Sequence, residues 1–185
     1  MPPIDDALLP AAQGALLLRL ARLTLAKQLK ARLSPADEET HRAALAAPDL
    51  QAVRATFVTL KRRGALRGCI GTLSACEPLA ESVRRNSCNA AFCDPRFPAL
   101  TGAELPEVTI EVSVLSEPRR LETNGPEDLL GRLRPGVDGV VLSRGESRAT
   151  FLPQVGEQLP RKEDFLGHLC LKAGLPRDAW REAGT

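Results

Sequence analysis

Aromatic residues are scarce in this sequence of 185 residues: there are five Phe, one Trp and no Tyr. Surfaces that bind single-stranded nucleic acid stack bases on exposed rings, so this scarcity argues against such a surface. The formal net charge is only +2, far from the strongly basic balance of most nucleic-acid-binding domains. Short basic clusters are present at Lys61-Arg62-Arg63, Arg84-Arg85 and Arg119-Arg120, without interleaved aromatics. We expect no nucleic-acid partner.

No stretch of the sequence is apolar enough to predict a membrane span. The most Leu-rich segment, Leu16 to Leu33, is interrupted by Arg and Lys side chains. The first ten residues contain Asp5 and Asp6 and lack the basic start of a secretory leader. The five Cys residues then fit a reducing compartment, where thiols stay free. We expect a cytoplasmic protein with no membrane partner.

Motifs for metals, phosphates and dinucleotides are also missing. The cysteines are spaced Cys69-x6-Cys76 and Cys88-x4-Cys93, without the Cys-x2-Cys pair of many zinc sites. Neither the P-loop nor the glycine pattern of dinucleotide-binding folds occurs. The sequence has two His residues, so a His-based catalytic pair would have to use one of them. We expect no metal ion and no cofactor.

Hydrophobic periodicity and turn residues predict helices interleaved with strands. The predicted helices cover 14–33, 35–46 with Ser34 as N-cap, 78–92, 126–133 and 162–173. The predicted strands cover 55–61, 66–71, 108–115, 139–143 and 148–152. Hairpins among the strands favour an α+β fold with a mainly antiparallel sheet and flanking helices, in a single domain that spans 1–185.

The most unusual strand is Leu66-Arg67-Gly68-Cys69-Ile70-Gly71. Glycines in a strand often mark a close approach of the backbone to a ligand or another segment. Strand alternation puts Arg67 and Cys69 on one face, and a guanidinium beside a thiol favours the reactive thiolate. Cys69 is therefore a candidate nucleophile, redox thiol or metal ligand. The competing interpretation is a small buried side chain in a tight hairpin.

Two other segments are candidates for binding a polar ligand. Asp94 and Arg96 follow a predicted helix on a turn made rigid by Pro95. They are suited either to orienting a ligand or to forming an ion pair that fixes the turn. Gln154 follows a predicted strand and its amide can both donate and accept hydrogen bonds.

These segments together resemble the AMMECR domain family. The resemblance is carried by the motif at 66–71, by Ala90-Ala91-Phe92-Cys93-Asp94-Pro95-Arg96-Phe97, by Glu111-Val112-Ser113-Val114-Leu115-Ser116 and by Phe151-Leu152-Pro153-Gln154-Val155. It extends from about Leu17 to Trp180. It implies two lobes with a cleft and a functional centre at the 66–71 motif. It also implies a prokaryotic setting in which such proteins are encoded beside a Memo-like protein and a radical S-adenosylmethionine protein, and we expect a bacterial source.

The activity of that family is not settled, so we consider two hypotheses. In the first, the chain is an enzyme or enzyme subunit that binds a small polar substrate in the cleft. Cys69 is its reactive thiol, and the substrate-binding residues are Arg67, Gly68, Gly71, Asp94, Arg96 and Gln154. In the second, the chain is a non-catalytic module that docks on the radical S-adenosylmethionine or Memo-like protein.

Some positions depart from the family pattern. Cys93 stands where relatives tend to carry Arg, and Asp138 where they often carry His. The sequence ends soon after Trp180, where relatives usually continue with a further strand. An open sheet edge invites pairing with another chain, so a homo-oligomer is a further hypothesis.

Overall fold

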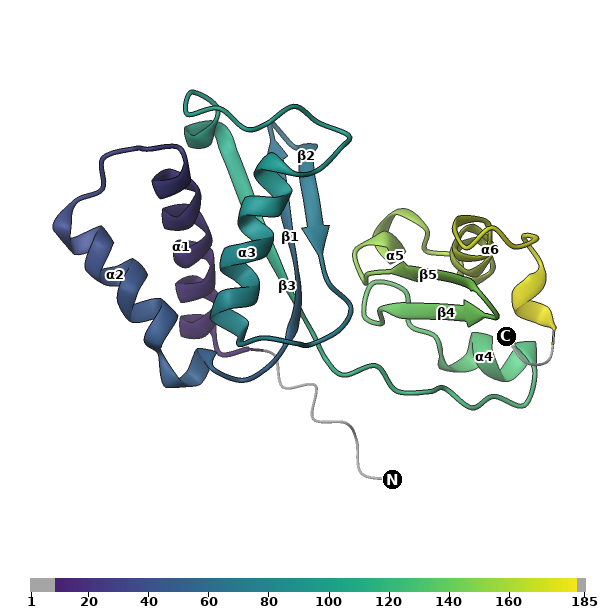
Figure 1. Ribbon diagram of the computed structural model, residues 1–185. Coiled ribbons are helices and arrows are strands. Elements are labelled where there is room, and N and C mark those ends of the chain that lie inside the picture. The colour runs from purple at the N-terminus through teal and green to yellow at the C-terminus, as the bar shows by residue number, and fades with distance from the viewer. Residues whose placement is uncertain (1–8, 183–185) are drawn as a thin grey trace. The chain divides into compact units, whose positions relative to one another are not determined.

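A computed structural model of the chain describes residues 9–182. It contains helices and antiparallel sheets (Figure 1), which confirms the predicted α+β class. The chain divides into two compact units, Met1–Glu117 and Pro118–Thr185. A cleft between two lobes stays a prediction. Most of the N-terminal segment used to argue against a leader peptide lies outside the described residues.

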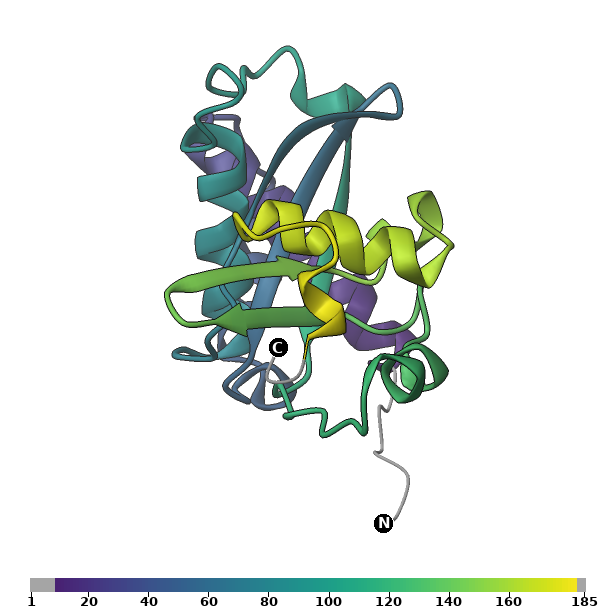
Figure 2. The ribbon, with the colours of Figure 1, turned by 90° about the vertical axis from the view of Figure 1, so that its right-hand side faces the viewer.

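Unit 1 is built on a three-stranded antiparallel sheet with the strand order β2-β1-β3. Helices α1 and α3 pack on one face of this sheet, and α2 packs on α1 (Figures 1 and 2). The core between them is formed by apolar side chains of both layers, including Leu17, Leu20, Leu25, Val58, Leu60, Val83, Val108 and Ile110. The elements are α1 (Ala11–Gln28), α2 (Pro35–Ala46), β1 (Ala55–Arg62), β2 (Ala65–Gly71), α3 (Leu79–Phe92) and β3 (Val108–Leu115), with 3-10 turns at Pro48–Leu50 and Leu105–Glu107.

The helix predicted over 14–33 is shorter at its C-terminal end, because α1 stops at Gln28. Lys30 takes a positive φ of 56°, and the N–H of Ala31 donates to the carbonyl of Ala26. This is the left-handed helix ending that glycine usually provides. The next helix begins as predicted, since the Ser34 hydroxyl accepts a hydrogen bond from the N–H of Asp37 at 3.1 Å.

The hairpin between β1 and β2 contains a register shift that brings Cys69 opposite Thr59. Arg63 and Gly64 both have positive φ, which is typical of a two-residue turn whose twist matches the strands. Beyond the turn, Lys61 pairs with Leu66 but Leu60 pairs with Gly68, so Arg67 has no partner in the ladder. Such a β-bulge inserts one residue into one strand.

Unit 2 consists of a β-hairpin with helices around it. The elements are α4 (Pro126–Arg132), β4 (Val140–Arg144), β5 (Ser147–Phe151), α5 (Val155–Gln158), α6 (Lys162–Lys172) and a 3-10 turn at Ala179–Arg181. As predicted, α6 buries Phe165, Leu166, Leu169 and Cys170. The Phe165 ring meets the edge of Phe151 with ring centroids 5.3 Å apart. The short helix α5 was not predicted.

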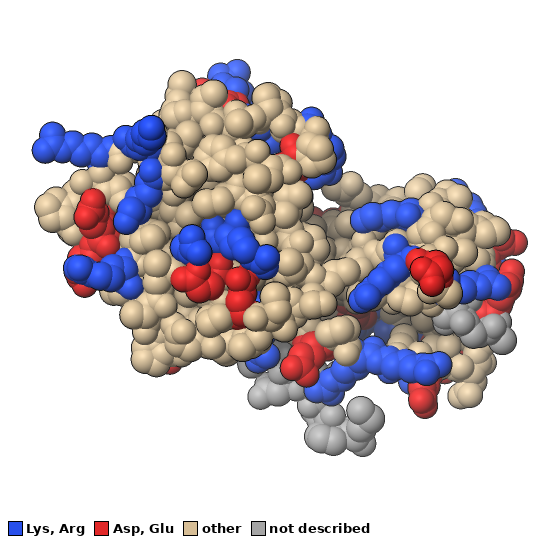
Figure 3. All heavy atoms as spheres, viewed as in Figure 1, with Lys and Arg blue, Asp and Glu red and all other residues tan. Residues whose placement is uncertain are grey.

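Charges of both signs are interspersed on the face of unit 1 that Figure 3 shows. Arg84 of α3 pairs with Glu81 of the same helix, and Arg85 of α3 pairs with Glu77, which precedes the helix. Over residues 9–182, no helix combines the length and the apolar composition needed to cross a membrane.

Candidate functional site

Cys69 lies on the sheet face opposite to the helices. Its partner in β1 is Thr59, whose own partner in β3 is Glu111. The Thr59 hydroxyl donates a hydrogen bond to the Cys69 sulfur at 3.2 Å. Beside them, Lys61 and Glu111 form an ion pair at 2.5 Å. We call Cys69, Thr59, Lys61 and Glu111 the polar face. Cys69 is partly exposed there.

The backbone of Cys69 is held by an ion pair from outside the sheet. β2 is an edge strand, so alternate N–H and C=O groups along its outer side have no neighbouring strand. The Asp94 carboxylate accepts a hydrogen bond from the Cys69 N–H at 2.8 Å. Arg96 Nη2 donates to the Cys69 carbonyl at 3.3 Å. The pair therefore occupies both main-chain groups of Cys69, as a partner strand would.

The sequence Asp94-Pro95-Arg96 is suited to forming this pair. Cys93 ends α3, and Pro95 keeps Asp94 out of helical geometry. The Asp94 carboxylate accepts hydrogen bonds from the Arg96 N–H at 3.1 Å, from Nε at 2.9 Å and from Nη2 at 2.7 Å. The bidentate contact fixes the direction of the guanidinium.

These contacts determine the ionisation of Asp94. Hydrogen bonds from Arg96, together with those from the main-chain N–H groups of Cys69 and Arg96, hold the pKa of the Asp94 carboxyl well below its usual value despite burial. The Asp94 side chain is 2% exposed, whereas that of Arg96 is 55% exposed. The site thus contains a buried carboxylate and a solvent-facing guanidinium beside one thiol.

The Arg67 side chain does not lie beside the Cys69 thiol, where strand alternation predicts it. Its Nε and Nη2 donate to the two Glu104 oxygens at 2.9 and 3.2 Å, and Nη2 also contacts the Ala99 carbonyl at 3.4 Å. The hydrogen bonds from Arg67 lower the pKa of Glu104 to about 2. The β-bulge at Arg67 breaks the alternation on which the expectation depended. The guanidinium that contacts Cys69 belongs to Arg96 instead.

The two motif glycines allow close packing between segments of the chain. A Cβ on Gly68 would collide with the Ala90 carbonyl in α3, and one on Gly71 would collide with the Phe57 ring and the Thr56 carbonyl. Because backbone atoms cannot move aside as side chains do, larger residues at these positions force the elements apart. The close approach that the glycines predicted is therefore made by the chain itself.

Gln154 belongs to unit 2, where it is the N-cap residue of α5. Its predicted role in the site of Cys69 stays a prediction.

The two histidines have other contacts. His41 Nε2 lies 3.1 Å from the Thr24 hydroxyl, and burial lowers the pKa of His41. His168 Nδ1 lies 2.8 Å from the Asp164 carbonyl. Over residues 9–182, no three His, Cys, Asp or Glu side chains are grouped so that they could hold a metal ion. The groups available for chemistry at Cys69 are its thiol, the Asp94 carboxylate and the Arg96 guanidinium.

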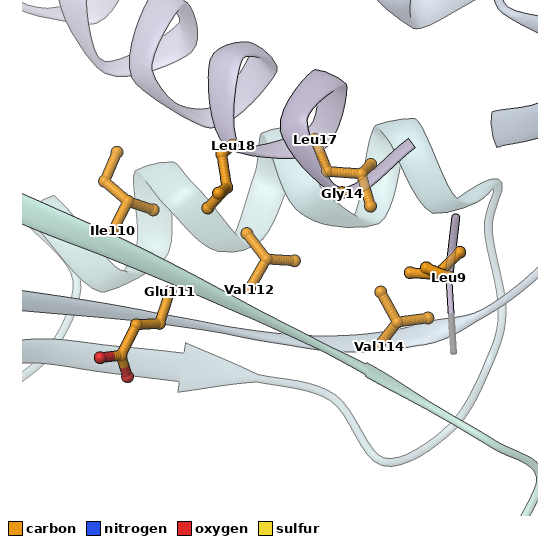
Figure 4. Close-up of a pocket in the computed structure, with 8 residues that line it drawn as sticks. All are labelled: Leu9, Gly14, Leu17, Leu18, Ile110, Glu111, Val112 and Val114. Atoms are coloured by element: carbon orange, nitrogen blue, oxygen red, sulfur yellow. The ribbon is translucent and has the colours of Figure 1, made fainter. Parts of the chain in front are cut away.

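An apolar groove of about 300 Å³ lies along the other edge of the sheet, between α1 and β3 (Figure 4). Leu17 and Leu18 line it from the helix, and Ile110, Val112 and Val114 line it from the strand. Of the four residues of the polar face, Glu111 also lines the groove, whereas Cys69 lies two strands away on β2.

The sequence matches a family model over most of its length. The model of the AMMECR1 family covers residues 18–185. The chain belongs to the AMMECR1 family. A protein of Thermofilum pendens is 39% identical to it over 188 residues, which is 95% of this chain and 85% of that protein. A protein of Thermococcus gammatolerans is 37% identical over 179 residues, or 93% of this chain and 84% of that protein.

A solved structure shares the fold of this AMMECR1-family chain. The crystal structure of an uncharacterised protein from Pyrococcus horikoshii aligns with a TM-score of 0.79 and 34% identity, covering 93% of this chain and 85% of that one. The relatives named here are archaeal, so they do not support the predicted bacterial source. Their names state no activity.

Thr59 is the residue of this AMMECR1-family site that sequence analysis missed. An uninterrupted hairpin register from the pair Arg62↔Ala65 would set Cys69 opposite Val58, which is fully buried under the helices. The bulge at Arg67 shifts Cys69 by one position, to Thr59. The adjacent Gly68 is an ambiguous signal, because an isolated glycine in a strand suggests either a bulge or a close approach of the backbone. It does not give the register, so the contact could not be predicted.

Proposed function

We propose that this AMMECR1-family chain is a cytoplasmic enzyme, or a subunit of one, that acts on a small polar substrate through the Cys69 thiol. The observation that carries the proposal is the hydrogen bond from the Thr59 hydroxyl to the Cys69 sulfur, at 3.2 Å. The hydroxyl holds the sulfur in a defined direction, and Cys69 is partly exposed, so an electrophilic substrate can reach it.

The surroundings of Cys69 differ from those of a cysteine that only fills space. Cys170 is such a residue: it is completely buried in the core of unit 2, and burial raises the pKa of its thiol. Cys69 is instead partly exposed; its sulfur accepts a hydrogen bond from the Thr59 hydroxyl, and its main-chain carbonyl accepts one from the Arg96 guanidinium. These features support a reactive thiol.

The other residues of the motif hold the thiol in place. Asp94 and Arg96 bind both main-chain groups of Cys69, and Gly68 lets α3 lie directly against β2. A functional group is effective when its supporting residues restrict its position. In this proposal Arg67 acts through its ion pair with Glu104, which ties the bulged part of β2 to the loop after α3.

The proposal is tested by alkylating the native full-length protein briefly with iodoacetamide at pH 7 and measuring its intact mass. We expect one fast adduct in the wild type, its loss in Cys69→Ser, and its retention in Cys93→Ser, which removes an exposed thiol. Equal rates of adduct formation in the wild type and in Cys69→Ser would reject a reactive Cys69. The non-catalytic module that docks on a radical S-adenosylmethionine or Memo-like protein would then be the better hypothesis.

A further inference from the structure

We infer that the substrate of the Cys69 site carries a small anionic group, such as a carboxylate, and that Nη1 of Arg96 binds this group. The inference rests on the proposed function and deepens it, because it names the class of substrate on which the thiol acts.

The first observation is how the donors of Arg96 are used. A guanidinium has five N–H donors in a planar fork. Nε and Nη2 donate to Asp94, and Nη2 also donates to the Cys69 carbonyl. Within residues 9–182, Nη1 has no hydrogen-bond partner. Because the side chain is 55% exposed, its remaining donors are accessible to a ligand.

The second observation is that the charges of the ion pair face different ways. The Asp94 carboxylate is 2% exposed and accepts four hydrogen bonds, from the Cys69 N–H and from the N–H, Nε and Nη2 of Arg96. Its charge is therefore directed into the protein. The free edge of the guanidinium is the charged group of the pair that a ligand meets, and guanidinium edges match carboxylate geometry.

The third observation is the position of this edge relative to the thiol. Arg96 is hydrogen-bonded to the main chain of Cys69 itself, and the negative charge of a Cys69 thiolate contributes to a raised pKa of Arg96, after the larger effect of Asp94. An anionic group on Nη1 is thus held next to the residue that bears the nucleophile. Arg67 cannot serve in this way, because its side chain is 10% exposed and bound to Glu104.

Two alkylating reagents of nearly equal size test the inference. Iodoacetate and iodoacetamide present the same carbon to the thiolate; the C–S bond forms while the C–I bond breaks, and iodide leaves with the bonding electrons. They differ in that only iodoacetate carries a carboxylate. The ratio of their rate constants at one cysteine is independent of the thiolate fraction, because both reagents require the thiolate.

We expect the iodoacetate-to-iodoacetamide ratio at Cys69 to exceed the ratio at the exposed Cys76 by about tenfold, the factor that one charge-assisted hydrogen bond supplies. The ratio should fall to that of Cys76 in Arg96→Gln and stay high in Arg84→Gln, which removes an exposed guanidinium of α3. Rates at each cysteine are obtained by peptide mass spectrometry.

If Arg96→Gln does not fold, the wild type is tested at increasing salt concentration instead. A higher salt concentration should slow the reaction of iodoacetate with Cys69 and leave the reaction of iodoacetamide unchanged. Equal ratios at Cys69 and Cys76, or a high ratio in Arg96→Gln, would overturn the inference. Failure of both reagents to modify Cys69 would overturn the proposed function instead.

Discussion

The buried carboxylate of Asp94 accepts a hydrogen bond from the main-chain N–H of Cys69 at 2.8 Å. This contact joins the end of α3 to the edge strand that bears the thiol, across 25 residues of sequence. Arg96 completes it by donating to the carbonyl of the same residue. The position of Cys69 therefore depends on an ion pair outside the sheet, which gives the pair a measurable role in stability.

Asp94→Asn should lower the free energy of unfolding at pH 7 by about 2 kcal/mol, the scale for losing hydrogen bonds to a buried charged group. Because the pKa of Asp94 is lowered in the folded protein from an ordinary value of 3.8, its charge stabilises the fold fully above that value. The stabilisation is lost as the pH falls through the lower, folded pKa. Urea unfolding of both proteins between pH 2.5 and 7 measures the difference.

The difference in the free energy of unfolding between the wild type and Asp94→Asn should stay constant above about pH 5 and become smaller below pH 3.8. Asp128→Asn is a matched control: Asp128 is a more exposed acid that pairs with Arg132, so its replacement should destabilise the protein clearly less than Asp94→Asn. A difference in unfolding free energy that grows toward low pH would contradict the conclusion that the charge of Asp94 stabilises the fold.

Thr59→Val should slow iodoacetamide labelling of Cys69 at pH 7 by about fivefold, the factor that corresponds to one hydrogen bond of about 1 kcal/mol. Valine keeps the shape of the threonine side chain but cannot donate a hydrogen bond to the sulfur. Thr59→Ser retains the hydroxyl and should keep the wild-type rate. The measurement is the labelling rate of Cys69 by peptide mass spectrometry; equal rates for valine and threonine would show that the hydroxyl does not act on the thiol.

Glu104→Gln should destabilise the protein by about 3 kcal/mol, since it leaves the mostly buried Arg67 without a charged partner. Glu107→Gln, which affects the more exposed pairs with Arg62 and Arg63, should destabilise the protein clearly less, because solvent screens exposed ion pairs. Both are measured by urea unfolding. Neither should change the rate at which iodoacetamide labels Cys69 at pH 7. A changed rate in Glu104→Gln alone would restore Arg67 as the residue that tunes the thiol.

Gly68→Ala should destabilise unit 1 by about 3 kcal/mol, because the new methyl group collides with the Ala90 carbonyl of α3. Gly14→Ala is the matched control: a Cβ at Gly14 in α1 meets nothing within 4 Å, and alanine favours a helix by about 1 kcal/mol over glycine. Thermal unfolding should therefore shift in opposite directions in the two variants. A neutral Gly68→Ala would contradict the close contact between β2 and α3.

The elements of the fold were predictable wherever local sequence determines them. Val108, Ile110 and Val112 alternate with polar residues, and the strand β3 has the predicted bounds, Val108–Leu115. Ser34 and Pro35 begin α2 as capping residues should. The end of α1 was missed because Lys30, rather than glycine, takes the left-handed conformation, and side-chain identity alone gives no sign of that.

The candidate site was predictable in its residues but not in its contacts. Asp94 and Arg96 are close in sequence, and their ion pair was one of the two expected outcomes. The neighbours of Cys69 depend on the bulge at Arg67. In an antiparallel ladder a shift of one residue exchanges the two faces. That shift sets Cys69 opposite Thr59. Arg96 reaches the Cys69 carbonyl from the turn after α3, and strand alternation predicts neither contact.

The central claim, a reactive thiol at Cys69, is tested most directly by the rates of iodoacetamide labelling at all five cysteines of the native protein, measured at pH 7 by peptide mass spectrometry. The account predicts that Cys69 is labelled fastest of the five. Burial raises the pKa of Cys88 and of Cys170, so both should be labelled slowly. Labelling of Cys69 only after unfolding in denaturant would show that it is a packing residue and contradict the account.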